Sequence, residues 1–198
     1  MSPEPQQGEP QVLDPWSGTP RGQRPLVSFP LKVLWSAIGL LGLGLVVGVL
    51  LSGRWEVERS ASIPAPPSAV FPWLDDPRRW DEWAPLGAVR ATFSGPERGA
   101  GATRRWDDPE VGEGVFTILA SAPDREVGYR VEVQGGRMIT EGTLRLEPEA
   151  SGTRIVWHEG GDFGRNPLLG YVARSMDRTQ GAQMEGALAR LAEKVGGK

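Results

Sequence analysis

Residues 33–53 contain no charged side chain, and Lys32 and Arg54 bound this run on its two sides. A helix of this length rises about 1.5 Å per residue and spans roughly 30 Å, the thickness of the hydrocarbon core of a bilayer. A buried helix of a soluble domain is rarely so uniformly apolar. A cleaved signal peptide would show a short basic start and a small-residue cleavage motif, which this segment lacks. We therefore predict one uncleaved transmembrane helix over residues 31–53.

The segment before this helix, residues 1–30, contains seven prolines among Gln, Gly and Ser and has almost no periodic apolar pattern. Such a composition is typical of a disordered tail. Arg21, Arg24 and Lys32 on this side of the helix slightly outnumber the basic residues just beyond it, which favours a cytoplasmic N-terminus. The chain has no cysteine, which suits either side of a membrane.

The remaining residues, 54–198, are predicted to form one domain, and their charge excludes some functions. The whole chain has a net charge of −3, and its arginines are scattered singly or in pairs. Nucleic-acid-binding proteins usually present a clustered basic face, so we expect no nucleic-acid partner. One histidine, no cysteine and no regularly spaced carboxylates also predict no metal site and no metal cofactor.

Most of the domain reads as a series of strands separated by turn residues. Apolar residues alternate with polar ones, so that Val127 and Tyr129 share one face while Arg130 and Glu132 share the other. Gly135-Gly136 is a hairpin signal between two of these segments. Hairpins with one apolar face predict an antiparallel sheet that needs a cover. The expected strands are residues 55–63, 89–95, 101–108, 111–122, 125–134, 137–149 and 151–160.

The C-terminal segment can supply that cover as a long helix. Asn166 is a suitable N-cap, and Pro167 suits the first helical position. Two apolar stripes, separated by Gly181, follow this start and end near Val195. Together, the sheet and the long helix predict an α+β domain in which the sheet curls around the helix. The stripe residues are Leu169, Val172, Ala173, Met176, Met184, Ala187, Leu188, Leu191 and Val195.

A short helical segment with three tryptophans, FPWLDDPRRWDEWAP at residues 71–85, precedes most of the strands. Pro67 and Ser68 begin a first helix, and Pro77 opens a second turn in which Trp80 and Trp83 share a face. We interpret the stretch as a lid whose tryptophans pack and whose acids and arginines face water. The alternative is that the tryptophan rings line the mouth of a cavity.

This order of elements, with VERSASIPAPPSAVFPWLDDPRRWDEWAP, GTRIVWHEG and GRNPLLGYVARSMDR, resembles the START-like, Bet v 1-like helix-grip superfamily (SRPBCC). It is similar in particular to membrane-anchored bacterial proteins of the polyketide cyclase or dehydrase family. The resemblance covers essentially residues 54–196. It implies a helix-grip fold, a hydrophobic cavity between the sheet and the long helix, and a location in the bacterial inner membrane.

Strand parity and the helical stripe select the residues expected to line that cavity. A one-residue error in register would turn each strand's set outward. His158 follows Trp157 on its strand, so we expect it on the outer face, away from catalysis. Asp107 and Asp108 read as a solvated turn, and no catalytic residue is assigned. The predicted ligand-binding residues are Tyr129, Val131, Met138, Leu144, Trp157, Val172 and Met176.

From these observations we expect a single-pass protein that binds a hydrophobic small molecule or lipid. One alternative is a cyclase or dehydratase, which requires a buried ionisable group facing the cavity. The inward strand positions are expected to be mostly Val, Leu, Met, Tyr and Trp, which argues against that alternative. The other is a protein-interaction module of the envelope or of a stress response, in which side chains fill the cavity.

Overall fold

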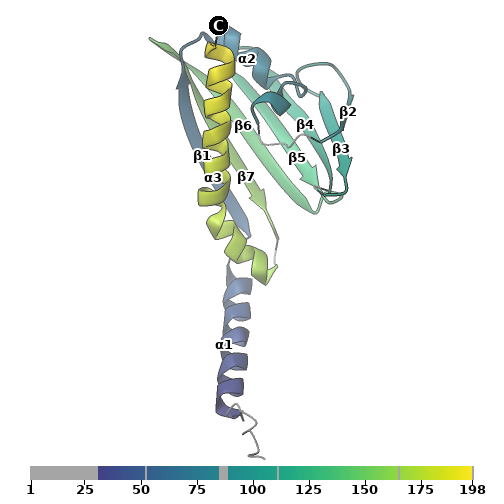
Figure 1. The fold of residues 1–198 in the computed structure, drawn as a ribbon, viewed down its shortest axis with the longest axis vertical. Helices are drawn as coiled ribbons and strands as arrows, with labels where there is room; N and C mark the ends of the chain where they lie inside the picture. Colours follow the sequence, from purple (N-terminus) through teal and green to yellow (C-terminus); the bar gives the residue numbers. More distant parts are fainter. Residues whose placement is uncertain (1–30, 52, 85–88, 111, 165, 198) are drawn as a thin grey trace, which may run out of the picture. The chain divides into compact units, whose positions relative to one another are not determined.

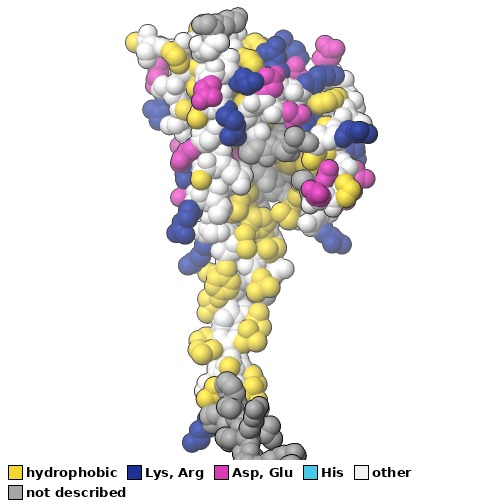
Figure 2. All heavy atoms as spheres, in the orientation of Figure 1, with side chains coloured by type: hydrophobic (Ala, Val, Ile, Leu, Met, Phe, Trp, Pro, Cys, Tyr) yellow, Lys and Arg dark blue, Asp and Glu magenta, His cyan; other side chains and the backbone are white. Residues whose placement is uncertain are grey.

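The computed structural model describes residues 31–51, 53–84, 89–110, 112–164 and 166–197. The predicted disordered tail, residues 1–30, lies outside them. Helix α1 extends over Leu31–Leu50 and is, in the described part of the chain, the one helix long and apolar enough to cross a membrane. Figure 2 shows hydrophobic side chains along α1 and charged side chains gathered over the rest of the described chain.

The compact unit from Leu41 to Lys198 is built on a sheet of seven antiparallel strands among the described residues. Their order is β1-β7-β6-β5-β4-β3-β2, so the first strand pairs with the last and each other strand pairs with its neighbour in sequence. The predicted antiparallel sheet is confirmed. The strands are β1 (Arg54–Ile63), β2 (Ala91–Ser94), β3 (Thr103–Asp108), β4 (Gly112–Ala122), β5 (Glu126–Val133), β6 (Met138–Glu149) and β7 (Gly152–Asp162).

Helix α3 (Pro167–Gly196) runs lengthwise along the curled sheet (Figure 1). Asn166 caps it as predicted, because its side chain accepts a hydrogen bond of 2.9 Å from the backbone N–H of Leu168. The second apolar stripe of α3 is buried against the sheet. These observations confirm an α+β helix-grip fold. The buried residues of that stripe are Met184, Ala187, Leu188 and Leu191.

Gly181 marks the point where α3 crosses close to β1. A Cβ atom at this position would overlap the guanidinium group of Arg59. That guanidinium donates to Glu185 at 2.6 Å and to Asp177 at 2.9 Å, both on α3. The glycine between the two stripes therefore lets an arginine on β1 bind the side of the helix.

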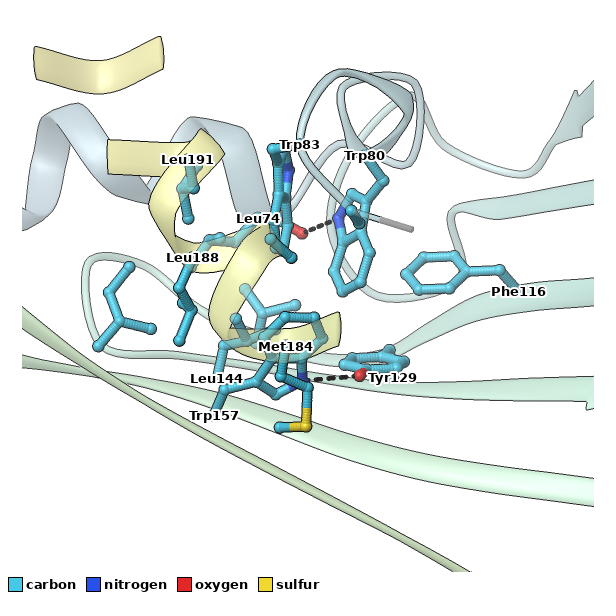
Figure 3. Packing of buried hydrophobic residues seen from close by; sticks show 14 of the residues in the cluster. Leu74, Trp80, Trp83, Phe116, Tyr129, Leu144, Trp157, Met184, Leu188 and Leu191 are labelled. Carbon is cyan, nitrogen blue, oxygen red and sulfur yellow. Dashed lines mark hydrogen bonds between the residues drawn. The ribbon is translucent and has the colours of Figure 1, made fainter. Parts of the chain in front are cut away.

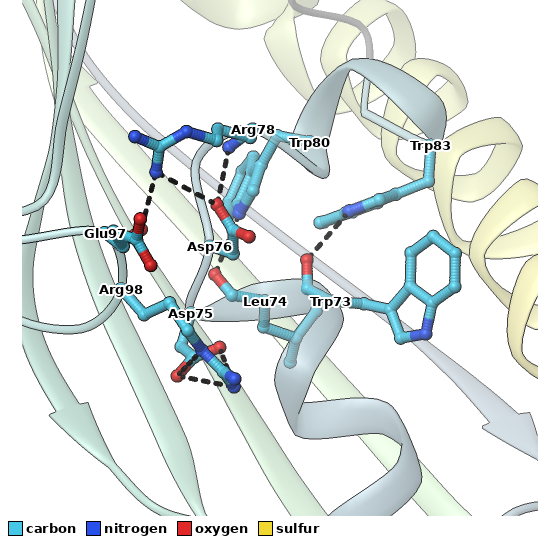
Figure 4. Close-up of polar contacts among 9 residues, drawn as sticks. All are labelled: Trp73, Leu74, Asp75, Asp76, Arg78, Trp80, Trp83, Glu97 and Arg98. Atoms are coloured by element: carbon cyan, nitrogen blue, oxygen red, sulfur yellow. Dashed lines mark hydrogen bonds and ion pairs between the residues drawn. The ribbon is translucent and has the colours of Figure 1, made fainter. Parts of the chain in front are cut away.

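The lid comprises α2 (Pro67–Leu74) and the 3-10 turn η1 (Trp80–Glu82). Trp80 and Trp83 are buried as predicted, and their ring centroids lie 4.7 Å apart. Their indole N–H groups donate to backbone carbonyls of α2, Trp80 to Leu74 at 2.8 Å and Trp83 to Trp73 at 3.1 Å (Figures 3 and 4). The tryptophans thus fix the lid to itself as well as to the core.

The prediction that the acids of the lid face water is wrong for one of them, Asp75, and holds for Asp81, which is exposed. Asp75 is buried, and the guanidinium of Arg98 in the β2–β3 loop contacts both of its carboxylate oxygens (Figure 4). Asp81 forms an ion pair of 2.6 Å with Arg104, which is fully buried in β3. Buried charges need such partners, and the partners come from segments distant in sequence. These ion pairs hold the lid closed over the sheet.

The hairpin between β5 and β6 is longer than the two-residue turn that the sequence suggests. The strands end at Val133 and resume at Met138. Gln134, Gly135 and Gly136 all have positive φ angles of 54°, 65° and 82°. Two glycines supply this left-handed backbone without steric cost, and Gln134 is the non-glycine residue that also adopts it.

Candidate functional site

A pocket of about 190 Å³ lies between the sheet, the lid and α3. Its walls are rings and aliphatic groups, and its polar groups come from one glutamate, two glutamines, one threonine and the hydroxyl of one tyrosine. The strands contribute through alternate residues, because successive side chains of a strand point to opposite faces. The lining residues are Trp80, Ala84, Tyr129, Val131, Thr140, Trp157, Glu159, Gln180 and Gln183.

A chain of hydrogen bonds in this wall ends on the carboxyl group of Glu159. The indole N–H of Trp157 donates to the hydroxyl oxygen of Tyr129 at 2.8 Å (Figure 3). The Tyr129 hydroxyl donates in turn to Oε1 of Glu159, and Nε2 of Gln180 donates to Oε2 at 2.6 Å. Both carboxyl oxygens therefore have protein partners. The relay joins β5, β7 and α3 at one point.

Strand geometry explains why these groups meet. Trp157 and Glu159 are two residues apart on β7 and point to the same face. Glu159 pairs with Gly142 of β6, which in turn pairs with Tyr129 of β5. A Cβ atom on Gly142 would overlap the tyrosine ring. The missing side chain on β6 therefore leaves the space through which Tyr129 reaches across to Glu159.

The electrostatic state of the site follows from its burial. Glu159 is 5% exposed, and this desolvation raises the pKa of its carboxyl group above the ordinary value, although the hydrogen bonds from Tyr129 and Gln180 oppose the rise. Burial and the neighbouring glutamate also raise the pKa of the Tyr129 hydroxyl well above its ordinary value. The tyrosine stays protonated at neutral pH. Proton uptake or release in this site therefore belongs to Glu159.

Aromatic rings fill most of the space beside the pocket. The Trp80 ring lies 4.5 Å from the Phe116 ring and 4.8 Å from the Tyr129 ring between centroids. Trp83 packs edge-on to Trp157 at 5.6 Å. Such rings bury large apolar areas in defined orientations. The two readings of the lid tryptophans both hold for Trp80, which packs in the core and also borders the pocket.

The predicted site residues fall into two groups. Tyr129, Val131 and Trp157 come together at the pocket wall. The others lie elsewhere: Leu144 is buried in the core, while Met138 and Met176 are half-buried away from the pocket wall. Val172 is 43% exposed, so it does not border this pocket.

Sequence reasoning missed Glu159, which contributes the carboxyl group of the pocket. The same alternation that turns Ile155 and Trp157 inward also turns Glu159 inward, so the signal was present in the strand pattern. The expectation of mostly apolar inward positions does not include Glu159. Gln180 and Gln183 lie on α3 near Gly181, between the apolar stripes, and carried no pattern of their own.

His158 lies on the outer face of the sheet, as parity predicts, and borders a groove of about 520 Å³ with Glu56, Glu141 and Arg137. Among the described residues, no group of three or more His, Cys, Asp or Glu side chains is arranged to bind a metal ion. The outer groove thus presents mixed charges on an open sheet surface rather than an enclosed site.

Comparison with known proteins identifies the family. The model of a family described as "Polyketide cyclase / dehydrase and lipid transport" matches residues 54–196. This range agrees with the extent of the resemblance seen in the sequence. No curated protein matches the chain.

Solved structures share the fold at low sequence identity. Protein CV1439 from Chromobacterium violaceum is 16% identical with a TM-score of 0.52, over 71% of this chain and 96% of that one. An uncharacterized protein from Rhizobium leguminosarum is 15% identical with a TM-score of 0.53, over 73% and 96%. The di-domain ARO/CYC StfQ from the steffimycin biosynthetic pathway is 16% identical with a TM-score of 0.54, over 73% and 52%. At these identities the likeness concerns the fold alone.

Proposed function

Because the chain belongs to the family described as polyketide cyclase / dehydrase and lipid transport, we propose that its sheet domain, residues 54–198, binds a small hydrophobic molecule that carries one polar group. The observation that supports this most directly is the pocket itself, in which apolar walls surround the single carboxyl group of Glu159. Binding sites for small molecules commonly combine an apolar lining with a few placed polar groups. The polar group of the ligand would face Glu159 and Gln180.

The volume of the pocket limits the size of the ligand. A cavity of about 150 Å³ holds a benzene molecule, whereas pockets for drug-sized ligands measure roughly 300–1,000 Å³. The pocket of about 190 Å³ therefore fits a one- or two-ring molecule or the end of a lipid chain. A larger ligand would have to displace lid or α3 side chains.

We also propose that residues 31–53 anchor this domain in a membrane, with α1 as the spanning helix. Strand register supports a lipid or membrane-dissolved ligand. Thr140 of β6, in the pocket wall, pairs with Gly161 of β7. The next residue of β7, Asp162, pairs with Arg54, the first residue of β1. Arg54 follows the end of α1 by four residues. One wall of the pocket thus lies at the end of the sheet to which α1 is joined.

Filling the pocket tests the binding proposal. Thr140→Phe places a ring in the cavity, while Ile139→Phe adds the same ring to the opposite face of β6, where Ile139 is exposed. We expect Thr140→Phe to weaken the binding of 2-naphthol, a two-ring molecule with one hydroxyl, by about tenfold or more, equivalent to ~1.4 kcal/mol. Ile139→Phe should leave the affinity unchanged.

The measurement is a fluorescence titration of the full chain in lipid nanodiscs, with empty nanodiscs as the blank and thermal melts to confirm folding. Equal affinity in the parent and in folded Thr140→Phe would remove the pocket as the binding site. Failure of the folded parent to bind any small aromatic or acyl probe would favour the filled-core, protein-interaction alternative.

Proton transfer to a bound ligand is a second candidate function, favoured by the raised pKa of Glu159 and its hydrogen bond from Tyr129. As a base, Glu159 would take a proton from the carbon next to a ligand carbonyl and leave an enolate; the carboxyl group would exchange this proton with solvent and then return a solvent-derived one to the same carbon. With 2-tetralone in heavy water, we expect the parent to catalyse deuterium exchange at that carbon, measured by NMR. Glu159→Gln should retain binding and lose the exchange, and equal exchange rates would exclude this role.

A further inference from the structure

The first two turns of α3 carry large apolar side chains that remain exposed. Leu168 is 65% exposed, Tyr171 44% and Val172 43%. Their spacing of three and four residues places them on one helix face. Clustered exposure of this kind marks a surface that is covered in use, whereas scattered apolar residues carry no such meaning.

These turns lie beside the end of α1 within the compact unit Leu41–Lys198. The backbone N–H of Phe163, four residues before α3, donates to the carbonyl oxygen of Gly53 at 3.0 Å. The Tyr171 hydroxyl donates to the carbonyl oxygen of Gly44 at 2.8 Å. A Cβ atom added at Gly170 would lie 2.8 Å from the Cβ atom of Leu51, so the two helices approach closely there.

We infer that the first two turns of α3 enter the membrane interface next to α1 and form a second contact with the lipid bilayer. This inference rests on the proposed anchoring by α1. Gly44 lies six residues before the end of α1 at Leu50, or about 9 Å along the helix axis. When α1 spans the bilayer, the level of Gly44 is within the membrane. The Tyr171 hydroxyl, which contacts Gly44, is then at that depth, while the helix backbone at Gly170 lies beside Leu51 at the end of α1.

The composition of this part of α3 fits a lipid surface. Tyr is enriched where membrane proteins cross the interface between hydrocarbon and headgroups. Arg174 and Arg178 are exposed on the next turns, about 4.5 Å and 10 Å farther along α3 than Tyr171. At those levels their guanidinium groups meet lipid phosphates, and their stems cover apolar surface. The partner is therefore the bilayer that holds α1, with anionic headgroups preferred.

A measurement of membrane depth tests this contact. Because the chain has no native cysteine, a label attached to an introduced cysteine reports on that position alone. Single-cysteine variants of the full chain, labelled with the fluorophore NBD, are reconstituted in vesicles of phosphatidylcholine and phosphatidylglycerol that contain lipids with nitroxides on their acyl chains. The test position is Val172→Cys. Thr179→Cys is the matched control, because Thr179 is exposed on the same helix face two turns farther on. Leu41→Cys reports the insertion of α1.

We expect nitroxide quenching at positions 41 and 172 to be at least about twice that at position 179, and aqueous iodide to quench position 179 most. Nitroxide quenching at position 41 together with equal iodide quenching at positions 172 and 179 would overturn the inference about α3, while the proposed anchoring by α1 would stand. No nitroxide quenching at position 41 would instead reject the anchoring on which it rests. Protection of position 172 from iodide without nitroxide quenching would assign the face to a second copy of the chain and overturn the lipid contact.

Discussion

Trp80→Ala is expected to lower the free energy of unfolding by about 3–5 kcal/mol, the range seen when a buried aromatic ring is removed from a core. Trp80 is 1% exposed, and its ring packs against Trp83, Phe116 and Tyr129. Its indole N–H also ties η1 to Leu74 of α2. The substitution removes ring contacts between lid and sheet together with the hydrogen bond inside the lid.

Urea unfolding of the full chain in detergent, followed by circular dichroism of the sheet signal, measures this loss. Trp80→Phe is a graded control, because it keeps a ring and loses only the hydrogen bond and part of the contact area. We expect its cost to lie well below that of alanine. A loss under about 1 kcal/mol for Trp80→Ala would show that the lid contributes little to the core.

The second large effect concerns the pH dependence of stability. Burial raises the pKa of Glu159 in the folded protein above its ordinary value of 4.5, so the folded state holds this proton more tightly than the unfolded chain does. The stability contributed in this way is complete below the unfolded pKa. It is lost as pH rises through the folded pKa. The contribution of Glu159 to the stability of the parent should therefore fall as pH rises above about 4.5.

Glu159→Gln should remove this part of the pH dependence, because the amide keeps the shape of the side chain and cannot ionise. Melting curves of parent and variant at pH 4, 6 and 8 provide the measurement. Relative to the parent, the variant should gain stability from pH 4 to pH 8. Glu141→Gln serves as a control, since Glu141 is exposed on the outer face and pairs with Arg130. Parallel pH profiles for parent and Glu159→Gln would contradict the raised pKa.

Local patterns in the sequence were sufficient to predict most of the secondary structure and the fold class. Alternation in β5, β6 and β7 assigned the correct faces to Tyr129, Leu144 and Trp157, because side chains along a strand must alternate. The N-cap at Asn166 and the apolar helix α1 could also be predicted from the sequence, since both features depend on neighbouring residues only. The family resemblance over residues 54–196 followed from the same ordered pattern.

The site depended on relations that no local pattern contains. Strand alternation is enough to predict that Glu159 points inward. Only the pairing of β5, β6 and β7 shows that it meets Tyr129 across Gly142. The burial of Asp75 and of Arg104 required partners 23 residues away, Arg98 in the β2–β3 loop and Asp81 in the lid. A helical stripe gives the direction of Val172 on its own helix but not what faces it, and in the tertiary structure Val172 is 43% exposed.

Periodicity thus determined which residues share a face, because it follows from the geometry of one strand or one helix. Tertiary structure decided which faces meet, how much space remains between them and which charges are removed from water. The volume of the pocket, the raised pKa of Glu159 and the exposed start of α3 all arise from that second level. They depend on long-range packing, in which a displacement of one residue in register would place a different set of side chains together.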